Sequence, residues 1–163
     1  MTTARLRLHP WDAARHTDAL AAINRAPETV RYLNSGVPYT REESEGQSAR
    51  FAAHWEKYGF GLWALELLTT GELVGFAGLA HPVWFPALAP EVEVGWRLHP
   101  DFWGNGYATE AGRAALDAST GPVIAIIDPS NTPSIAVATR LGMTPGRTLP
   151  HPQRPGTLIV FET

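Results

Sequence analysis

Hydrophobic and polar residues alternate along the chain with two periods, one typical of strands and one typical of helices. Strands are predicted at residues 5–9, 60–68, 72–80, 91–98, 123–127 and 157–161, and the last is expected to pair with a stretch near 143–149. Helices are predicted at residues 13–25, 40–58, from 107 onward and at 131–141. The chain has no repeat, low-complexity tract or linker, so these elements predict one α/β domain over residues 1–163.

Helix starts and loops carry their own signals. Asp12 and Asn131 stand where helix N-caps are expected, and Thr40 with Glu43 forms a capping-box pattern. Residues 27–38 and 81–90 are rich in turn-forming residues and are predicted to be loops. The second loop contains large aromatic residues, so it is expected either to cover a substrate or to pack on the core.

Residues 93–110 form the most informative stretch, because a strand, a glycine turn and a helix start follow one another there. Free backbone N–H groups and the positive end of a helix dipole attract an anion, most simply a phosphate. No Gly-Lys-Ser/Thr follows, as a P-loop requires, and Thr109 stands where a dinucleotide fingerprint needs its third glycine or alanine. The stretch predicts a pyrophosphate-sized anion site; a plain turn with a helix cap is the alternative.

Composition narrows the function classes. The chain has 163 residues, a formal charge of −3 and no cysteine, which excludes cysteine nucleophiles and thiolate metal sites. The 13 basic residues form no run, so nucleic acid is not expected as a ligand. No apolar run approaches the ~20 residues of a membrane helix, and a cytoplasmic location is expected. The six histidines have no metal-ligand spacing, so no metal is predicted.

Residues 92–111, from Val-Glu-Val-Gly-Trp-Arg-Leu-His-Pro through Trp-Gly-Asn-Gly-Tyr-Ala-Thr-Glu-Ala, and residues 131–143, with Asn-Thr-Pro-Ser and Leu-Gly-Met, resemble a known family. They are similar to the acetyl-CoA-binding half of the GNAT N-acetyltransferases, most of all the RimJ/RimL branch. The order of the earlier elements is also similar to that family. The resemblance implies a single-domain GNAT-like fold, with a mixed central sheet of about six or seven strands flanked by about four helices.

The resemblance also implies a cofactor site. Backbone amides of residues 104–109 would hold the CoA pyrophosphate, and the backbone of residues 96–98 would run beside pantetheine. The implied cofactor-binding residues are Trp96, Arg97, Leu98, Trp103, Gly104, Asn105, Gly106, Tyr107, Ala108, Thr109 and Asn131. Trp103 departs from the Gln or Arg usual in the family, and a helix cap is the alternative function of Asn131.

Glu93 matches the strand glutamate that the family often uses as a general base. An attacking amine must be neutral, yet α-amines titrate at about 8 and lysine amines at about 10.4, so a carboxylate must take a proton. Glu91 shares the strand face and is the competing candidate.

The leaving-group acid is less well defined. The family's usual tyrosine is replaced by Ala138, so either the Ser134 hydroxyl protonates the thiolate or the thiolate leaves unaided. The Val94 amide is expected to support the oxyanion.

The resulting expectation is an N-acetyltransferase that moves acetyl from acetyl-CoA directly to a primary amine. The acceptor would be a protein or peptide N-terminus or a small amine, bound in a ternary complex. Two alternatives stay open: an acyltransferase using another acyl-CoA, and a CoA-binding regulatory module without turnover. A homodimer is compatible with the sequence.

Overall fold

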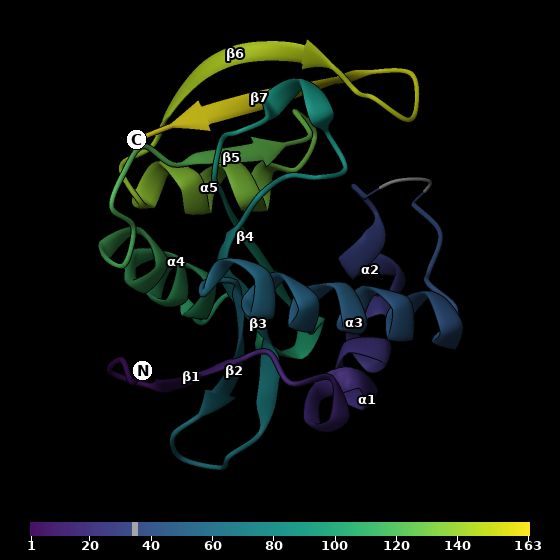
Figure 1. The fold of residues 1–163 in the computed structure, drawn as a ribbon, viewed down its shortest axis with the longest axis vertical. Helices are drawn as coiled ribbons and strands as arrows, with labels where there is room; N and C mark the ends of the chain where they lie inside the picture. Colours follow the sequence, from purple (N-terminus) through teal and green to yellow (C-terminus); the bar gives the residue numbers. More distant parts are fainter. Residues whose placement is uncertain (34–35) are drawn as a thin grey trace.

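The computed structural model describes residues 1–33 and 36–163, and these form one α/β unit built on a seven-stranded sheet (Figure 1). The strand order is β1-β2-β3-β4-β5-β7-β6. The strands are β1 (Leu6–Pro10), β2 (Leu62–Leu67), β3 (Leu73–Ala80), β4 (Glu93–Leu98), β5 (Ile124–Ile127), β6 (Thr144–Pro150) and β7 (Thr157–Glu162). The α-helices are α1 (Ala13–Arg25), α2 (Pro27–Val30), α3 (Arg41–Tyr58), α4 (Tyr107–Asp117) and α5 (Thr132–Arg140). The predicted α/β class with a mixed sheet of six or seven strands is therefore confirmed, with five described α-helices where about four were expected.

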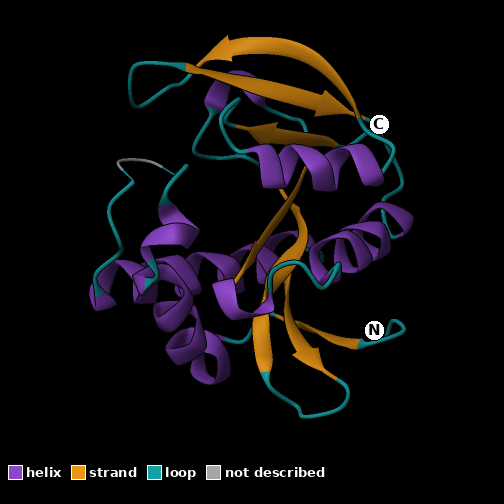
Figure 2. Cartoon of the chain, turned by 180° about the vertical axis from the view of Figure 1, so that it is seen from behind, coloured by secondary structure: helices purple, strands orange, loops and turns teal. Residues whose placement is uncertain are grey.

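The sheet is antiparallel except between β4 and β5. That parallel pairing has one register pair, Glu93 with Ile124, next to a hydrogen bond of 2.9 Å from the Ile124 N–H to the Val92 carbonyl. In Figures 1 and 2, β4 crosses between β1–β3 on one side and β5–β7 on the other. Beyond Glu93, the described strands leave one edge of β4 without a partner strand.

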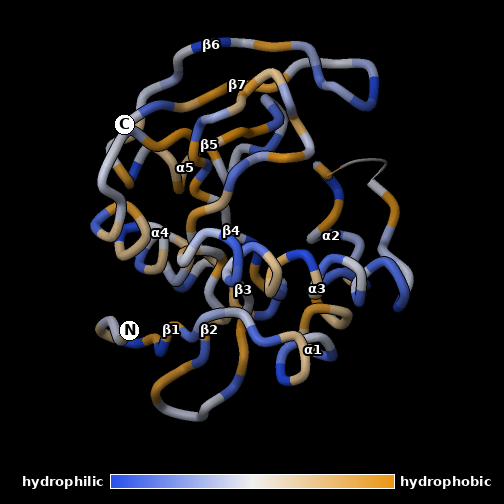
Figure 3. Tube along the Cα trace, in the orientation of Figure 1, coloured by the Kyte–Doolittle hydropathy of each residue, from blue (hydrophilic) through white to orange (hydrophobic). Residues whose placement is uncertain are grey.

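The two faces of the sheet are covered by different elements. Helix α4 packs against β3 and β4, where Val94, Leu98 and Ala111 belong to the main core. On the other face, α1 and α3 pack on each other, and a second cluster joins Trp11, Leu20 and Phe76. Figure 3 shows hydrophobic residues along much of β5 and β7. Alternation along β4 therefore sends Glu93 and Arg97 to the face that carries α1 and α3.

Local capping explains where three helices begin. The Asp12 carboxylate accepts from the Ala14 N–H at 2.9 Å, and Thr40 with Glu43 completes the predicted capping box. Asn131 accepts from the Ser134 N–H at 3.2 Å. These three N-cap predictions are confirmed.

Two sequence predictions need correction. Residues 27–38 were expected to be loop throughout, but α2 forms at Pro27–Val30. Pro27 takes an early helical position, which proline favours, and Val30 is fully buried. Residues 34 and 35 lie outside the described part. Strand β4 begins at Glu93 instead of residue 91.

No described helix has the length and apolarity needed to span a membrane.

Candidate active site

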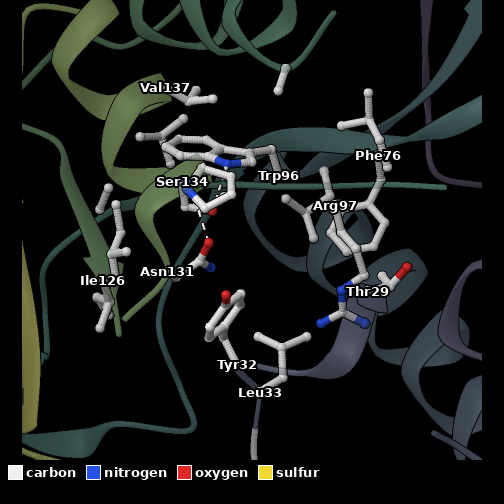
Figure 4. A pocket seen from close by; sticks show the side chains of 18 of the residues that line it. Thr29, Tyr32, Leu33, Phe76, Trp96, Arg97, Ile126, Asn131, Ser134 and Val137 are labelled. Carbon is white, nitrogen blue, oxygen red and sulfur yellow. Dashed lines mark hydrogen bonds between the residues drawn. The ribbon is translucent and has the colours of Figure 1, made fainter. Parts of the chain in front are cut away.

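A large cavity of about 1650 Å³ lies along the open edge of β4. One part, called here the glycine end, is lined by residues 103–110. The other part, called here the arginine end, is lined by Thr29, Tyr32, Tyr39, Gln47 and Arg97. Figure 4 shows side chains of α2, β4 and α5 pointing into the space between the two ends.

The glycine end is built around an uncapped helix terminus. Gly104 and Gly106 have φ of 78° and 80°, a left-handed conformation that favours glycine, and a Cβ on Gly104 would meet nothing within 4 Å. Gly106 is the N-cap of α4 and provides no side-chain hydrogen bond. Among the described helices of nine or more residues, α4 alone lacks a side-chain cap. Its first N–H groups are therefore available to an anion in the cavity.

Arg5 supports this loop, which sequence reasoning missed. Its Nη1 donates to the Asn105 carbonyl at 2.7 Å, its Nε donates to Glu110 at 2.7 Å, and its guanidinium lies 4.7 Å from the centre of the Tyr107 ring. The Thr3 hydroxyl also donates to Glu110 at 2.6 Å. The contacts join residues about a hundred positions apart, so no local pattern could indicate them.

The Glu110 carboxylate is ionised more readily than an ordinary glutamate. Burial alone would raise its pKa, but hydrogen bonds from Thr3 and Arg5 outweigh burial and hold the pKa below its usual value. The segment before β1 is thereby attached to the first turn of α4.

Glu93 lies in the wall of the cavity, on β4. Burial raises the pKa of Glu93 to about 7, although the Trp84 indole and the Ile126 backbone form hydrogen bonds that lower it. Trp84 belongs to the loop before β4, and Phe85 beside it is buried with Leu88 in a third cluster. The packing predicted for this loop is confirmed at Phe85, whereas Trp84 lines the cavity and covering of a substrate stays a prediction.

Glu91 is placed differently from Glu93. Its carboxylate forms a two-point ion pair with Arg147, at 2.7 and 3.0 Å, and it does not line the cavity. Arg147 also pairs with Glu162 at 3.1 Å. Glu91 therefore belongs to a surface ion-pair network, and of these two glutamates Glu93 is the one that lines the cavity.

The indole of Trp96 connects β4 to α5. Its Nε1 donates to the Ser134 hydroxyl at 3.3 Å, and Asn131 lies one turn earlier on the same helix (Figure 4). Because the Ser134 oxygen accepts from the indole, its own hydrogen is free to point into the cavity. Ala138 is fully buried, so the position of the family's tyrosine offers no polar group.

Backbone geometry corrects one expectation about the oxyanion. In the parallel pair of Glu93 with Ile124, the Ile124 N–H donates to the Val92 carbonyl, so the Val94 N–H faces the Ile124 carbonyl in return. The Val94 N–H therefore bonds within the sheet and is not available to an oxyanion. Because donors on one edge recur every second residue, the Trp96 N–H is the next on this edge.

The Trp103 side chain braces the turn before α4. Its Nε1 donates to the Leu98 carbonyl at 2.8 Å, while the side chain stays 46% exposed. This hydrogen bond holds the turn against the end of β4.

The cavity combines a helix start without a side-chain cap, an open strand edge and a carboxylate of raised pKa. These features together suit group transfer. A model of the acetyltransferase (GNAT) domain matches residues 5–144. The chain belongs to the GNAT acetyltransferase family, whose members use acetyl-CoA.

Relatives and solved structures agree with this assignment. The uncharacterised protein YkkB of Bacillus subtilis is 30% identical over 175 residues, which cover 99% of this chain and 94% of YkkB. FsC-acetyl coenzyme A-N(2)-transacetylase of Aspergillus fumigatus is 31% identical over 118 residues, which cover 68% of this chain and 48% of that protein. The crystal structure of an acetyltransferase from Agrobacterium tumefaciens is 30% identical, has a TM-score of 0.83, and is matched over 100% of this chain and 92% of that chain.

The residues of the glycine end fit the pyrophosphate of acetyl-CoA. The N–H groups at the start of α4 lack a side-chain cap, the space beside Gly104 is open, and Arg5 lines the same part of the cavity. Asn131 and Ser134 line the path from there to Glu93. Among the described residues, no group of three or more histidine, aspartate or glutamate side chains is placed to hold a metal.

Proposed function

We propose that this protein is an N-acetyltransferase that transfers the acetyl group of acetyl-CoA directly to a primary amine bound in the same cavity. The single observation that carries the proposal is the position of Glu93, whose pKa is raised to about 7, in the cavity that also contains the uncapped end of α4. A base with a pKa near neutrality is matched to proton removal at neutral pH.

In this proposal the glycine end positions acetyl-CoA. Backbone N–H groups of residues 104–109 bind the pyrophosphate, and Asn131 contributes a polar edge. The backbone of Trp96, Arg97 and Leu98 provides the open strand edge beside pantetheine. Placing the thioester next to a bound amine makes the transfer effectively intramolecular, which removes a large part of the entropic barrier.

Glu93 accepts a proton from the acceptor ammonium, directly or through a water molecule. The neutral amine nitrogen then bonds to the thioester carbon, the carbon–sulfur bond breaks, and CoA leaves as its thiolate. The Trp96 N–H supports the carbonyl oxygen as it gains negative charge. The nitrogen loses its second proton to solvent as the amide forms. The Ser134 hydroxyl, oriented by the Trp96 indole at 3.3 Å, donates a proton to the thiolate and is reprotonated by solvent.

The acceptor is expected to be a protein or peptide N-terminus or a small amine. Relatedness to an Aspergillus N(2)-transacetylase supports transfer to nitrogen. The motif resemblance described above supports a position near the RimJ/RimL branch.

The proposal is tested by incubating the protein with acetyl-CoA and a panel of peptides and small amines, and detecting acetylated amines by mass spectrometry. We expect acetylation of at least one class, and a shift in thermal unfolding with millimolar acetyl-CoA. Binding of acetyl-CoA without any transfer would instead establish a CoA-binding module. Absence of binding would reject the site itself.

A further inference from the structure

The arginine end of the cavity contains a guanidinium in an unusual environment. Arg97 extends from β4 between α1 and α3, and its Nη1 donates to the Asn24 carbonyl oxygen at 2.6 Å and lies 3.4 Å from the Gln47 carbonyl oxygen. The rings of Phe76 and Tyr39 flank it, with centres 5.3 and 5.7 Å from its Cζ. Figure 4 shows the guanidinium pointing into the cavity near Thr29.

No carboxylate of the described chain forms an ion pair with Arg97. The other cavity arginine with strong contacts, Arg5, has Glu110 as its partner. Around Arg97 the hydrogen-bonding partners are the amides of Asn24 and Gln47 and the Tyr39 hydroxyl, and burial lowers the pKa of the guanidinium. Holding a guanidinium away from bulk water without an opposite charge is unfavourable, and an anionic ligand would relieve that cost.

The surrounding network holds Arg97 in place without neutralising it. Asn24 is fully buried and donates to Gln47 at 2.8 Å and to Ser44 at 3.1 Å, so its carbonyl oxygen is fixed toward Arg97. A guanidinium has five N–H donors, more than these neutral acceptors use, and the side chain lines the cavity. The remaining donors are available to a ligand.

Glu93 and Arg97 lie on the same face of β4, four residues apart, so their Cα atoms are separated by about 13 Å. A molecule that extends along this face would meet a carboxylate near one end and an uncompensated cation near the other. An acceptor with an ammonium group and an anionic group matches both ends.

We infer that Arg97, oriented by Asn24 and Gln47, binds a carboxylate of the acceptor, so that the preferred substrates are amino acids, or short peptides, that carry a free carboxylate besides the reacting amine. Planar two-point pairing makes arginine well suited to a carboxylate. The inference rests on the proposed acetyl transfer for its catalytic meaning, but carboxylate binding is measurable without turnover.

The experiment compares matched acceptors that differ only in the anionic group: γ-aminobutyrate, ε-aminocaproate and the dipeptide Gly-Gly, each against its carboxamide. With acetyl-CoA saturating, we expect the wild type to favour at least one carboxylate over its carboxamide by about tenfold or more in kcat/KM, as one charged hydrogen-bonded pair provides. Arg97→Gln should reduce this ratio to near one, and Arg97→Lys should retain part of it. Because only the backbone of residue 97 is proposed to contact pantetheine, calorimetric affinity for acetyl-CoA verifies in both variants that this strand edge is intact.

Arg50→Gln is the matched control, because Arg50 is an exposed arginine that lines the same cavity, and it should leave the ratio intact. Thermal unfolding with and without acetyl-CoA verifies that each variant is folded. Calorimetric binding of the same pairs to the CoA-bound protein measures the preference even if no amine is acetylated, which separates failure of the subsite from failure of the proposed reaction. Equal values for carboxylate and carboxamide throughout the panel would overturn the inference. A stronger preference for O-phosphoethanolamine than for every carboxylate would overturn the carboxylate assignment.

Discussion

The Glu93 carboxylate depends on a tryptophan contributed by the preceding loop. Burial raises the pKa of Glu93 to about 7, and the Trp84 indole N–H opposes that rise by bonding to the charged form. At neutral pH a large share of the protein therefore carries Glu93 as the carboxylate that can accept a proton. Trp84 is 37% exposed and lines the cavity together with Glu93.

Replacing Trp84 by Phe should raise the pKa of Glu93, because the ring remains while the indole donor is lost. The pH at which kcat/KM reaches half its plateau should then move upward, with little change in the plateau at high pH. Trp103→Phe is the control, since its indole bonds to the Leu98 carbonyl and leaves Glu93 alone. A pH profile that does not move in W84F would show that the indole bond does not set the Glu93 pKa.

At the scale of elements, the turn before α4 combines two left-handed glycines with a helix start that has no side-chain cap. A glycine N-cap costs the helix only a few tenths of a kcal/mol relative to a side-chain cap, and it leaves the first N–H groups without a side-chain acceptor. The other long described helices carry a side-chain cap. The exception thus occurs where a ligand is proposed to replace the capping group.

Gly104→Ala and Gly71→Ala form a matched pair that separates strain from ligand binding. Both glycines have left-handed φ, 78° and 74°, and an added Cβ would meet nothing within 4 Å in either case. Both changes should therefore cost a similar ~1–2 kcal/mol of stability. Only Gly104→Ala should raise the Kd for acetyl-CoA, by about tenfold or more, measured by calorimetry. Equal Kd values in the two variants would argue against a pyrophosphate site at this turn.

Local pattern was enough to predict most elements, because strand alternation, the capping box at Thr40 and the cap at Asn131 are properties of neighbouring residues. Helix α2 escaped prediction because four residues are too few for a helical period, and Pro27 is as typical of a turn as of a helix start.

The site was only partly readable from sequence. Alternation puts Glu91 and Glu93 on one face and cannot separate them; the distinction arises from Arg147 on β6, which pairs with Glu91. The family resemblance predicted that the backbone of Arg97 runs beside pantetheine. The surroundings of its side chain depend on how α1 and α3 pack on the sheet. The difference between the two glutamates and the surroundings of Arg97 therefore both depend on contacts between residues far apart in the sequence.

At the scale of the whole molecule, the Arg5, Thr3 and Glu110 contacts attach the start of the chain to the glycine end of the cavity. Strand β1 lies at one edge of the sheet. Helix α4 packs on β3 and β4 and also contacts β1, so it lies close to the segment before β1. The N-terminal segment and the turn before α4 therefore stabilise each other.

Glu110→Gln should destabilise the protein at neutral pH by ~1 kcal/mol, because partly exposed pairs contribute little individually. The pKa of Glu110 is depressed on folding, so its contribution is present above the ordinary pKa and is lost as the pH falls through the lower, folded-state pKa. The difference in Tm between E110Q and the wild type should accordingly shrink in acid. Glu91→Gln, which breaks a surface pair with Arg147, is the control and should leave acetyl-CoA affinity unchanged, whereas E110Q should weaken it. Equal acetyl-CoA affinity in E110Q and the wild type would disprove the link to the loop.

The most direct test of the whole account is the rate of N-acetyl product formation as a function of pH, for the wild type and Glu93→Gln, at saturating acetyl-CoA. The account predicts a wild-type rate that rises with pH to a plateau with a midpoint near the Glu93 pKa of about 7. E93Q should lose that midpoint and ~100-fold or more of the rate while binding acetyl-CoA with unchanged affinity. An E93Q enzyme with the wild-type rate and pH profile would contradict the assignment of Glu93 as the base.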